Sequence, residues 1–371
     1  MSELFESSVI NGMRLANRFI RSATWEGMAN DDGSVTPRLI DTMTALAKGG
    51  VGLIISSHAY VSPEGQATPW QIGIYKDELI PGLQQMAGAV HAHGGKIVMQ
   101  LAHAGNFAME KLTGLPAYVV SDFAGLAASR RHEIGAQDFQ KIIAAFAAAA
   151  GRAKAAGYDG VQLHSAHGYL LSQFLSPLFN HRRDDYGGEV RHRAKIHLEV
   201  LHAVREAVGP DYPILIKLNC RDFQEGGLSL EESLQAAKLL AEAGLDAIEL
   251  SGGLLTGGKL SPSRPGIDSV AQEAYFKEEL RAFKKAIKIP LSLVGGIRSF
   301  EVAEQLVKGG AADYISMSRP FIREPDLIKR WQAGDRRKAE CTSDNLCFRP
   351  GFKGDGIYCV TRKRELKKME A

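Results

Sequence analysis

Ala156 to Tyr169 reads AGYDGVQLHSAHGY, and this stretch decides the fold. An alanine-rich segment meets a glycine, a short apolar run follows, and polar residues come directly after that run. The same order recurs as AGLDA at residues 243–247 and as GGAAD at residues 309–313. Glycine readily takes the left-handed conformation that ends a helix. Each repeat therefore predicts a helix that stops and a buried strand that begins.

Eight short apolar runs along the chain are candidates for buried strands, and their starts lie 24 to 64 residues apart. The runs are Arg18–Thr24, Val51–Ala59, Lys96–Ala104, Gly160–Ala166, Ile214–Cys220, Ala247–Gly253, Pro290–Gly296 and Tyr314–Pro320. This spacing leaves room for a helix between strands, and apolar periodicity predicts helices at Phe139–Ala156, Leu230–Ala243 and Phe300–Lys308. Eight alternating units favour an α/β fold of the (β/α)₈ TIM-barrel type over an open sheet. We expect one barrel domain over residues 1–335 and a C-terminal extension over residues 336–371, with no separate domain there.

Composition excludes several classes of function. The 371 residues carry 45 basic and 42 acidic side chains, and this balance gives no field that would favour nucleic acid. The basic run from Arg362 to Lys368 is typical of a solvated tail. The sequence contains no secretory pattern and no stretch of about 18 apolar residues that would span a membrane. With four cysteines and no disulfide framework, a reduced cytoplasmic protein is expected.

Polar residues interrupt the apolar runs where the predicted strands end. In TIM barrels the chemistry lies at the carboxyl ends of the strands, so these residues predict a ring of polar groups around one mouth. The ring comprises Ser22, Thr24, Ser56 to His58, Gln100, His103, His164, His167, Lys217, Asn219, Glu249, Ser251 and Ser316 to Arg319.

His164, His167 and Tyr169 close the fourth predicted strand. Two imidazoles three residues apart can donate to the same carbonyl oxygen and stabilise an enolate-like transition state. A phenol remains protonated at neutral pH and can deliver its proton to a carbanionic carbon. The alternatives are packing roles for all three side chains or a His-x-x-His zinc site, although no acidic or cysteine partner sits at ligand spacing.

Gln100 and Lys217 end the third and fifth strands. An amide offers a donor and an acceptor together, as the pyrimidine edge of a flavin requires. A fixed ammonium would stabilise the anion of a reduced flavin. Lys217 is also compatible with a Schiff-base nucleophile and with a salt bridge, and these residues alone leave the three roles open.

The ends of the last two strands carry a phosphate-binding pattern. Gly295-Gly296 follows the seventh strand and Ser318-Arg319 the eighth, where barrels frequently bind phosphate. Paired glycines let backbone N–H groups approach an anion, and arginine adds a fork of charged donors. Because no G-x-G-x-x-G motif follows a strand, a nicotinamide would have to visit the site rather than occupy a domain of its own.

Together these residues resemble the Old Yellow Enzyme family, the NADH:flavin oxidoreductase barrels, over about residues 5–335. The strongest match is HSAHGYLLSQFLSPLFNHRRDDYGG at residues 164–188, and LANRFIRSA, VMQLAHAG, VGGI and MSRP support it. The resemblance implies non-covalent FMN, NAD(P)H as a transient reductant, and ping-pong reduction of an activated alkene, typically an α,β-unsaturated carbonyl compound. It implies that His164 and His167 bind the carbonyl oxygen and that Tyr169 donates the proton. The residues that it places at FMN are Ala23, Thr24, Gln100, Lys217, Gly295, Gly296, Ser318 and Arg319, and we expect Ser22 and His58 to lie at the cofactor as well.

The sequence departs from the family pattern in three places. Trp25 stands where relatives have a threonine or cysteine that tunes the flavin, so either Thr24 replaces that residue or the indole fills the pocket. His58 stands where a small residue is common, and either a hydrogen bond to a neighbouring residue or contact with FMN would explain it. Longer relatives hold an iron–sulfur cluster on four cysteines. This chain has Cys341, Cys347 and Cys359 but Asp344 at the remaining position, so no iron–sulfur cluster and no other bound metal are expected.

Three other functions remain compatible with the sequence. A flavin-dependent amine dehydrogenase or demethylase would use the same barrel, although Tyr169 as an acid favours reduction. A Schiff-base aldolase would use Lys217, and a flavin carrier would have no substrate. We expect a small enone-type substrate, no nucleic acid or membrane partner, and a possible homo-oligomer. The sequence leaves the physiological substrate and the choice between NADH and NADPH open.

Overall fold

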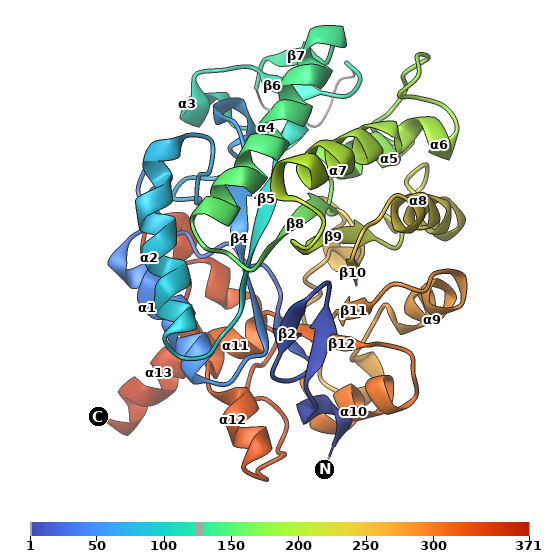
Figure 1. Ribbon diagram of the computed structural model, residues 1–371. Coiled ribbons are helices and arrows are strands. Elements are labelled where there is room, and N and C mark those ends of the chain that lie inside the picture. The colour runs from blue at the N-terminus through green and yellow to red at the C-terminus, as the bar shows by residue number, and fades with distance from the viewer. Residues whose placement is uncertain (1, 123–128, 371) are drawn as a thin grey trace.

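Eight parallel strands close into a barrel in the computed structural model, which describes residues 2–122 and 129–370 (Figure 1). Around the barrel the order is β3-β4-β5-β8-β9-β10-β11-β12, and β12 pairs with β3. The strands are β3 (Phe19–Arg21), β4 (Leu53–Tyr60), β5 (Ile97–Ala102), β8 (Gly160–Ser165), β9 (Ile214–Asn219), β10 (Ala247–Ser251), β11 (Leu291–Val294) and β12 (Tyr314–Met317). Each strand overlaps one predicted run, so the predicted (β/α)₈ barrel is confirmed.

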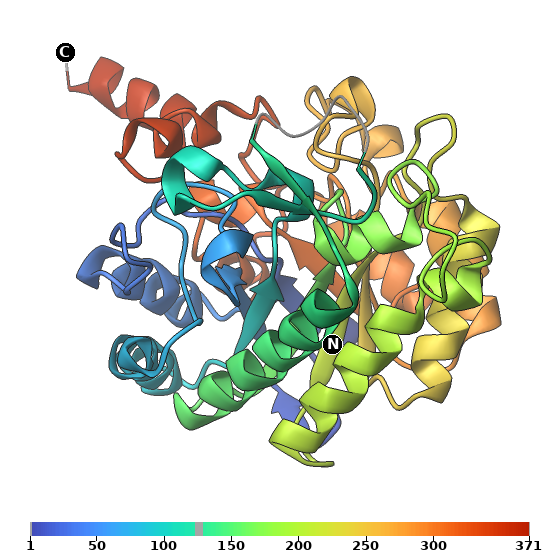
Figure 2. The ribbon, with the colours of Figure 1, turned by 90° about the horizontal axis from the view of Figure 1, so that it is seen from above.

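Helices surround the strands, as the view from above shows (Figure 2). The long outer helices are α1 (Pro37–Lys48), α2 (Ile80–His91), α4 (Ala136–Ala155), α7 (Lys195–Val208), α8 (Leu230–Glu242), α9 (Lys277–Ala286) and α10 (Phe300–Lys308). The remaining α-helices are α3 (Glu110–Thr113), α5 (Leu170–Leu175), α6 (Val190–Arg193), α11 (Arg319–Arg323), α12 (Leu327–Gln332) and α13 (Val360–Met369). Within the part of the chain that the structure describes, no helix is both long and apolar enough to cross a membrane.

The glycine helix stops adopt the predicted conformation. Gly157, Gly244 and Gly310 have φ angles of 79°, 89° and 66°, which are left-handed values. The three predicted helices match α4, α8 and α10. Helix α4 begins three residues earlier than predicted because the Asp138 carboxylate accepts a hydrogen bond from the Gly135 backbone N–H at 2.9 Å and caps the first turn.

A hairpin closes the amino-terminal end of the barrel. Strands β1 (Ser8–Ile10) and β2 (Met13–Leu15) pair antiparallel beside the barrel (Figure 1). Their buried apolar side chains pack in one cluster with residues from the starts of the barrel strands, namely Ile20, Leu53, Val98, Leu215, Ala247 and Tyr314. This layer is apolar, so the polar chemistry of the barrel is confined to its opposite end.

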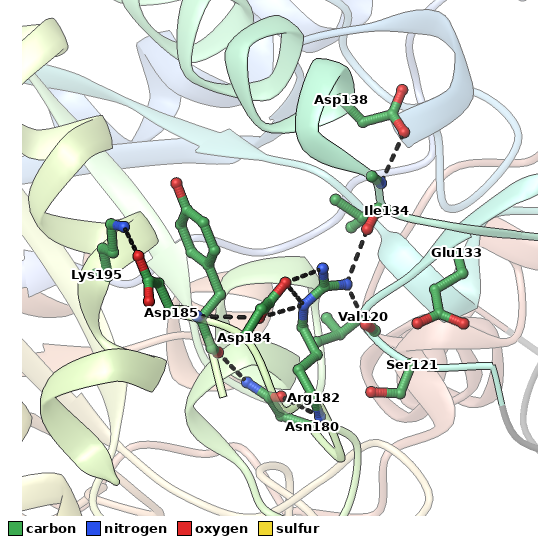
Figure 3. Close-up of polar contacts among 12 residues, drawn as sticks. Val120, Ser121, Glu133, Ile134, Asp138, Asn180, Arg182, Asp184, Asp185 and Lys195 are labelled. Carbon is green, nitrogen blue, oxygen red and sulfur yellow. Dashed lines mark hydrogen bonds and ion pairs between the residues drawn. The ribbon is translucent and has the colours of Figure 1, made fainter. Parts of the chain in front are cut away.

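Arg182, in the segment that follows α5, holds two neighbouring loops in place. The Arg182 guanidinium donates to the carbonyl oxygens of Val120 at 2.9 Å and Ile134 at 2.8 Å, and it pairs with Asp184 (Figure 3). Val120 and Ile134 directly follow β6 (Ala117–Val119) and β7 (Arg131–Glu133), a two-stranded sheet inserted between β5 and β8. Arg182 therefore connects this two-stranded sheet to the segment between α5 and α6.

The C-terminal extension folds back onto the barrel. The Ala339 N–H donates to the Arg298 carbonyl at 2.9 Å, and the Ile357 N–H donates to the Glu26 carbonyl at 2.8 Å. Helix α13 follows this segment. The division of the chain at residue 335 stays a prediction.

Candidate active site

A cavity of about 420 Å³ lies at the carboxyl ends of the barrel strands. Every residue predicted for the site lines it: Ser22, Ala23, Thr24, Trp25, His58, Gln100, His164, His167, Tyr169, Lys217, Gly295, Gly296, Ser318 and Arg319. These residues come from segments up to 297 positions apart, from Ser22 to Arg319, and the barrel brings them together because its parallel strands all end at one face. The roles assigned to them from the sequence stay predictions.

Some members of the predicted polar ring do not line the cavity. His103 is buried behind it, where its ring stacks on Tyr118 with centroids 5.7 Å apart and its Nδ1 accepts from the Gly105 N–H at 3.0 Å. Asn219 faces backbone groups instead, since its amide accepts from the His167 N–H and donates to the Gly253 carbonyl. Ser56, Ser57 and Glu249 are likewise outside the lining. The prediction was wrong for these five because a polar residue near a strand end can be held by neighbouring groups, as Glu249 is by Lys217 and Gln162, instead of facing the mouth.

His164, His167 and Tyr169 form a compact cluster of rings. The His164 centroid lies 5.4 Å from that of His167 and 4.5 Å from that of Tyr169. Burial, together with the positive charge of Lys217, holds the pKa of both imidazoles well below its usual range. Both rings are therefore neutral at pH 7, and each carries one N–H and one lone pair.

The backbone turn after β8 produces this clustering. His167 has a φ angle of 65° and Gly168 one of 87°, both left-handed. A Cβ atom at Gly168 would lie 2.9 Å from the Phe107 ring, so only glycine fits there. The His167 ring is fixed by a 2.8 Å hydrogen bond between its Nε2 and Ser251 Oγ.

His58 contacts the predicted proton donor. Its Nε2 lies 3.2 Å from the Tyr169 hydroxyl oxygen, and the two rings meet edge to face with centroids 5.4 Å apart. Burial, and secondarily the charge of Lys217, lowers the pKa of His58 to about 4, while burial raises the pKa of Tyr169. His58 therefore lines the cavity and makes the hydrogen bond to a neighbouring residue, and its contact with FMN stays a prediction.

Lys217 belongs to a buried polar chain that crosses four strands. Its Nζ lies 3.2 Å from Glu249 Oε2 and donates to Ser22 Oγ at 2.9 Å. Gln162 donates to the same Glu249 oxygen at 2.9 Å and accepts from Gln100 Nε2 at 2.7 Å. Burial lowers the pKa of Lys217, and Glu249 opposes that shift. The salt bridge predicted as one of three roles is thus present, and the Gln100 amide oxygen is left for a ligand.

The opposite part of the cavity combines glycine backbone with arginine. Gly295 and Gly296 have φ angles of 155° and 71°, and a Cβ at Gly296 would lie 2.7 Å from the Tyr275 ring. Arg319 Nη1 donates to the Arg264 carbonyl at 2.9 Å and to Asn345 Oδ1 at 2.7 Å. These contacts hold the guanidinium against the cavity wall beside the bare glycine backbone, which suits an anion.

Trp25 lines the cavity together with residues that sequence reasoning missed. Its ring lies 4.7 Å from that of Phe352, a side chain that is 64% exposed. The lining residues that sequence reasoning missed include Arg298 and, from the extension, Ser343, Asn345, Phe348 and Phe352. Arg298 follows Gly296 by two residues and could have been found from that spacing. The others lie in the extension, which has no periodic pattern, and only its return over the barrel places them here. Thr24 and Trp25 both line the cavity, so the choice between them at the flavin stays open.

The three cysteines of the extension are free thiols, as is Cys220. Asp344 accepts hydrogen bonds from the Thr342 and Thr361 hydroxyls at 3.0 and 2.6 Å, and Cys359 Sγ accepts from the Arg362 N–H. Over residues 2–122 and 129–370, no three histidine, cysteine or acidic side chains are grouped to hold a metal. The prediction about an iron–sulfur cluster stays a prediction.

Comparison with known proteins gives a consistent result. The family model described as "NADH:flavin oxidoreductase / NADH oxidase family" matches residues 3–338. An NADH oxidase from Thermoanaerobacter brockii is 38% identical over 92% of this chain and 53% of its own length. An NADPH dehydrogenase from Listeria monocytogenes is 33% identical over 89% of this chain and 94% of its own length. This chain thus spans about half the length of the first relative and nearly all of the second.

A solved structure of an Old Yellow Enzyme homologue from Zymomonas mobilis superposes with a TM-score of 0.77 at 26% identity, covering 94% of this chain and 98% of that one. The family model covers most of the chain, and the solved structure agrees with the observed barrel. The chain therefore belongs to the NADH:flavin oxidoreductase / NADH oxidase family, the barrels of the Old Yellow Enzyme type.

Proposed function

We propose that this protein is an FMN-dependent oxidoreductase that uses NAD(P)H to reduce activated alkenes, above all α,β-unsaturated carbonyl compounds. The observation that carries the proposal is the cluster of His164, His167 and Tyr169 in a single cavity with Lys217 and Arg319. Two neutral imidazoles and a phenol suit a carbonyl oxygen and an adjacent carbon, while the two cations suit the two ends of a flavin mononucleotide.

The cavity residues fit FMN on physical grounds. Lys217 and Gln100 offer an ammonium and a free amide oxygen to a pyrimidine ring, as that heterocycle requires. Gly295 and Gly296 line the cavity with backbone that carries no side chain of its own, in the same cavity as the fixed guanidinium of Arg319, and this combination suits a phosphate. We assign FMN binding to Ser22, Ala23, Thr24, His58, Gln100, Lys217, Gly295, Gly296, Ser318 and Arg319, and substrate contact to Trp25 and the ring cluster.

Bound FMN would supply the hydride that NAD(P)H provides. The residues of the chain supply the rest of the chemistry. His164 and His167 donate N–H groups to the substrate carbonyl oxygen and stabilise the negative charge that develops there. Their lowered pKa keeps them neutral, so each retains its lone pair as well as its N–H. Tyr169 holds a proton at its hydroxyl oxygen and delivers it to the substrate carbon, because burial keeps the phenol protonated across the physiological pH range.

The contacts of Lys217 argue against a Schiff-base aldolase. An imine-forming lysine needs a free amine that can reach a carbonyl carbon. Here the Nζ lies between Glu249 and Ser22, and although burial lowers the pKa of Lys217, the carboxylate opposes that shift. A lysine held by two partners is better suited to stabilise an anionic ring than to attack a substrate.

A visible absorption spectrum followed by anaerobic titration tests the proposal. The purified protein should bind FMN stoichiometrically, show a flavin spectrum and bleach on addition of NADH or NADPH. A protein that neither retains nor takes up FMN would contradict the proposal, and trapping of a substrate on Lys217 by borohydride would support the aldolase instead.

A further inference from the structure

A histidine from one strand and a tyrosine from another share a hydrogen bond inside the cavity. His58 lies on β4 and Tyr169 follows β8, 111 residues later, and their Nε2 and hydroxyl oxygen are 3.2 Å apart. Both side chains line the cavity and are nearly enclosed, at 8% and 7% exposure. Among the described residues, His58 provides the one side-chain hydrogen bond to the Tyr169 hydroxyl. Any effect of the His58 imidazole on the chemistry therefore passes first through the Tyr169 hydroxyl.

The tautomer of His58 decides where the Tyr169 proton points. Lys217 is the charged group facing His58, and His164 and His167 are the titratable neighbours, so the ring is a neutral imidazole with one N–H. If Nε2 carries the hydrogen, it donates to the phenol oxygen, and the Tyr169 O–H is free to face a ligand in the cavity. If Nδ1 carries it, Nε2 accepts the phenol hydrogen and turns that proton away from the cavity.

A buried phenol that gives up its proton also needs a new one. Burial raises the pKa of Tyr169, so a phenolate at this position is strongly basic and costly to leave unpaired. Over residues 2–122 and 129–370, none of His164, His167 and Lys217 makes a hydrogen bond to the Tyr169 hydroxyl. His58 Nε2 is the adjacent group that can return a proton.

We propose that His58 relays to Tyr169 the proton that Tyr169 delivers to the substrate, an inference that rests on the proposed function. As the Tyr169 O–H bond breaks and the proton passes to the substrate carbon, the His58 Nε2–H bond breaks and restores the phenol. Nδ1 takes up one proton from solvent, and the hydroxide left behind is neutralised by the buffer, so the imidazole stays neutral in its other tautomer. One solvent proton is consumed, no electron leaves either residue, and exchange with water resets the tautomer between turnovers. His58 is therefore a positioning residue that acts through Tyr169.

Two substitutions at His58 distinguish a proton relay from a packing role. His58→Gln keeps an N–H group that can hold the phenol but cannot pass a proton through itself, whereas His58→Ala removes both functions. His202→Ala, on the outer surface of α7 where His202 pairs with Glu206, is the matched control for loss of a histidine. All variants are compared as FMN-loaded proteins, with flavin absorbance as the check on folding.

The experiment measures single-turnover reoxidation of the NAD(P)H-reduced protein by 2-cyclohexenone, with and without added imidazole. We expect His58→Ala and His58→Gln each to slow this step by about 10²-fold, the lower range for a proton-transfer partner, and to slow it far more than the NAD(P)H step. Added imidazole should restore part of the rate in His58→Ala, and His58→Ala should have no further effect in a Tyr169→Phe background. Full activity of His58→Gln, absence of rescue, or independent effects of the two substitutions would overturn the relay.

Nitrogen-15 spectra of histidine-labelled, FMN-loaded protein give a readout other than activity. The relay predicts that His58 populates the Nε2–H tautomer and that Tyr169→Phe shifts its tautomer balance. A ring fixed as the Nδ1–H tautomer in both proteins would contradict it. A protein that reduces no enone at all would contradict the proposed function, whereas equal enone reduction with and without His58 would contradict the relay alone.

Discussion

The pKa of the Tyr169 phenol depends on its surroundings in the cavity. In water a phenol has a pKa of about 10, and burial in the cavity raises it further. The residue lies beside the neutral ring of His164, and its hydroxyl oxygen is 3.2 Å from His58 Nε2. A proton is thus held firmly until a stronger base, such as a carbanionic carbon, is formed beside it.

Replacing Tyr169 by Phe tests its assignment as the proton donor. The ring remains and the proton is lost, so the alkene step should slow by about 10²- to 10⁴-fold while reduction by NAD(P)H is nearly unaffected. Stopped-flow absorbance resolves the two half-reactions. Equal slowing of both steps, or of neither, would rule out this assignment.

At the residue scale the sequence predicted many of the side chains that line the cavity but not the contacts that hold them in place. The strand-end rule selected His58, yet nothing in the local sequence could reveal its contact with Tyr169, because the partners are 111 positions apart. The same rule wrongly included His103, whose direction depends on its local bond to the Gly105 N–H. Orientation depends on packing between strands, which periodicity along one strand does not encode.

At the scale of elements, four neighbouring strands share one polar chain. β9 carries Lys217, β10 carries Glu249, β8 carries Gln162 and β5 carries Gln100. The chain of contacts orients the two groups that we assign to the flavin pyrimidine.

Replacing Lys217 by Met removes the positive charge without much change in length. We expect the midpoint potential of bound FMN to fall by tens of millivolts, since about 30 mV corresponds to 1.4 kcal/mol for a two-electron couple. Lys217→Arg keeps the charge and is the matched control. An unchanged potential in Lys217→Met, measured by xanthine oxidase-coupled reduction against a reference dye, would place Lys217 away from the flavin ring.

The loop anchor at Arg182 makes a separate prediction at this scale. Arg182→Ala leaves the carbonyl groups of Val120 and Ile134 without their donor and should lower the free energy of unfolding by about 1–3 kcal/mol. The neighbouring Arg183, which is exposed, serves as the control. Urea denaturation measures both, and equal stability of the Arg182 and Arg183 variants would show that the anchor is dispensable.

For the molecule as a whole, the barrel was the most predictable feature. Glycine helix stops, eight apolar runs and their spacing are all local signals, and each corresponds to an observed element. The return of the extension over the cavity was not predictable, because Asn345 and Phe352 sit in a segment without periodicity. Their placement depends on long-range contacts such as that of Arg319 with Asn345.

Buried neutral histidines should make the stability of the whole protein depend on pH. Burial lowers the pKa of His58 to about 4 and that of His197 to about 3, below the value of about 6.5 expected in the unfolded chain. Below pH 6.5 the unfolded chain binds more protons than the native one, so stability is lost as the pH falls. Each such histidine contributes a slope of up to about 1.4 kcal/mol per pH unit.

His197→Gln isolates one of these contributions. An amide can keep the 2.8 Å hydrogen bond with Ser165 Oγ but does not titrate in this range. Urea unfolding between pH 7.5 and 5 should give a shallower loss of stability for the variant than for the unsubstituted protein. Identical slopes would mean that His197 is protonated equally in the native and unfolded states.

The central claim is that one cavity brings the imidazoles of His164 and His167 and the phenol of Tyr169 to an enone held beside reduced FMN. The most direct measurement is anaerobic mixing of the NAD(P)H-reduced protein with 2-cyclohexenone, followed by flavin absorbance and by analysis of the product. The account predicts full reoxidation with one equivalent of cyclohexanone formed per flavin. Reduced flavin that persists with every enone supplied, and reoxidises on admission of dioxygen, would contradict it.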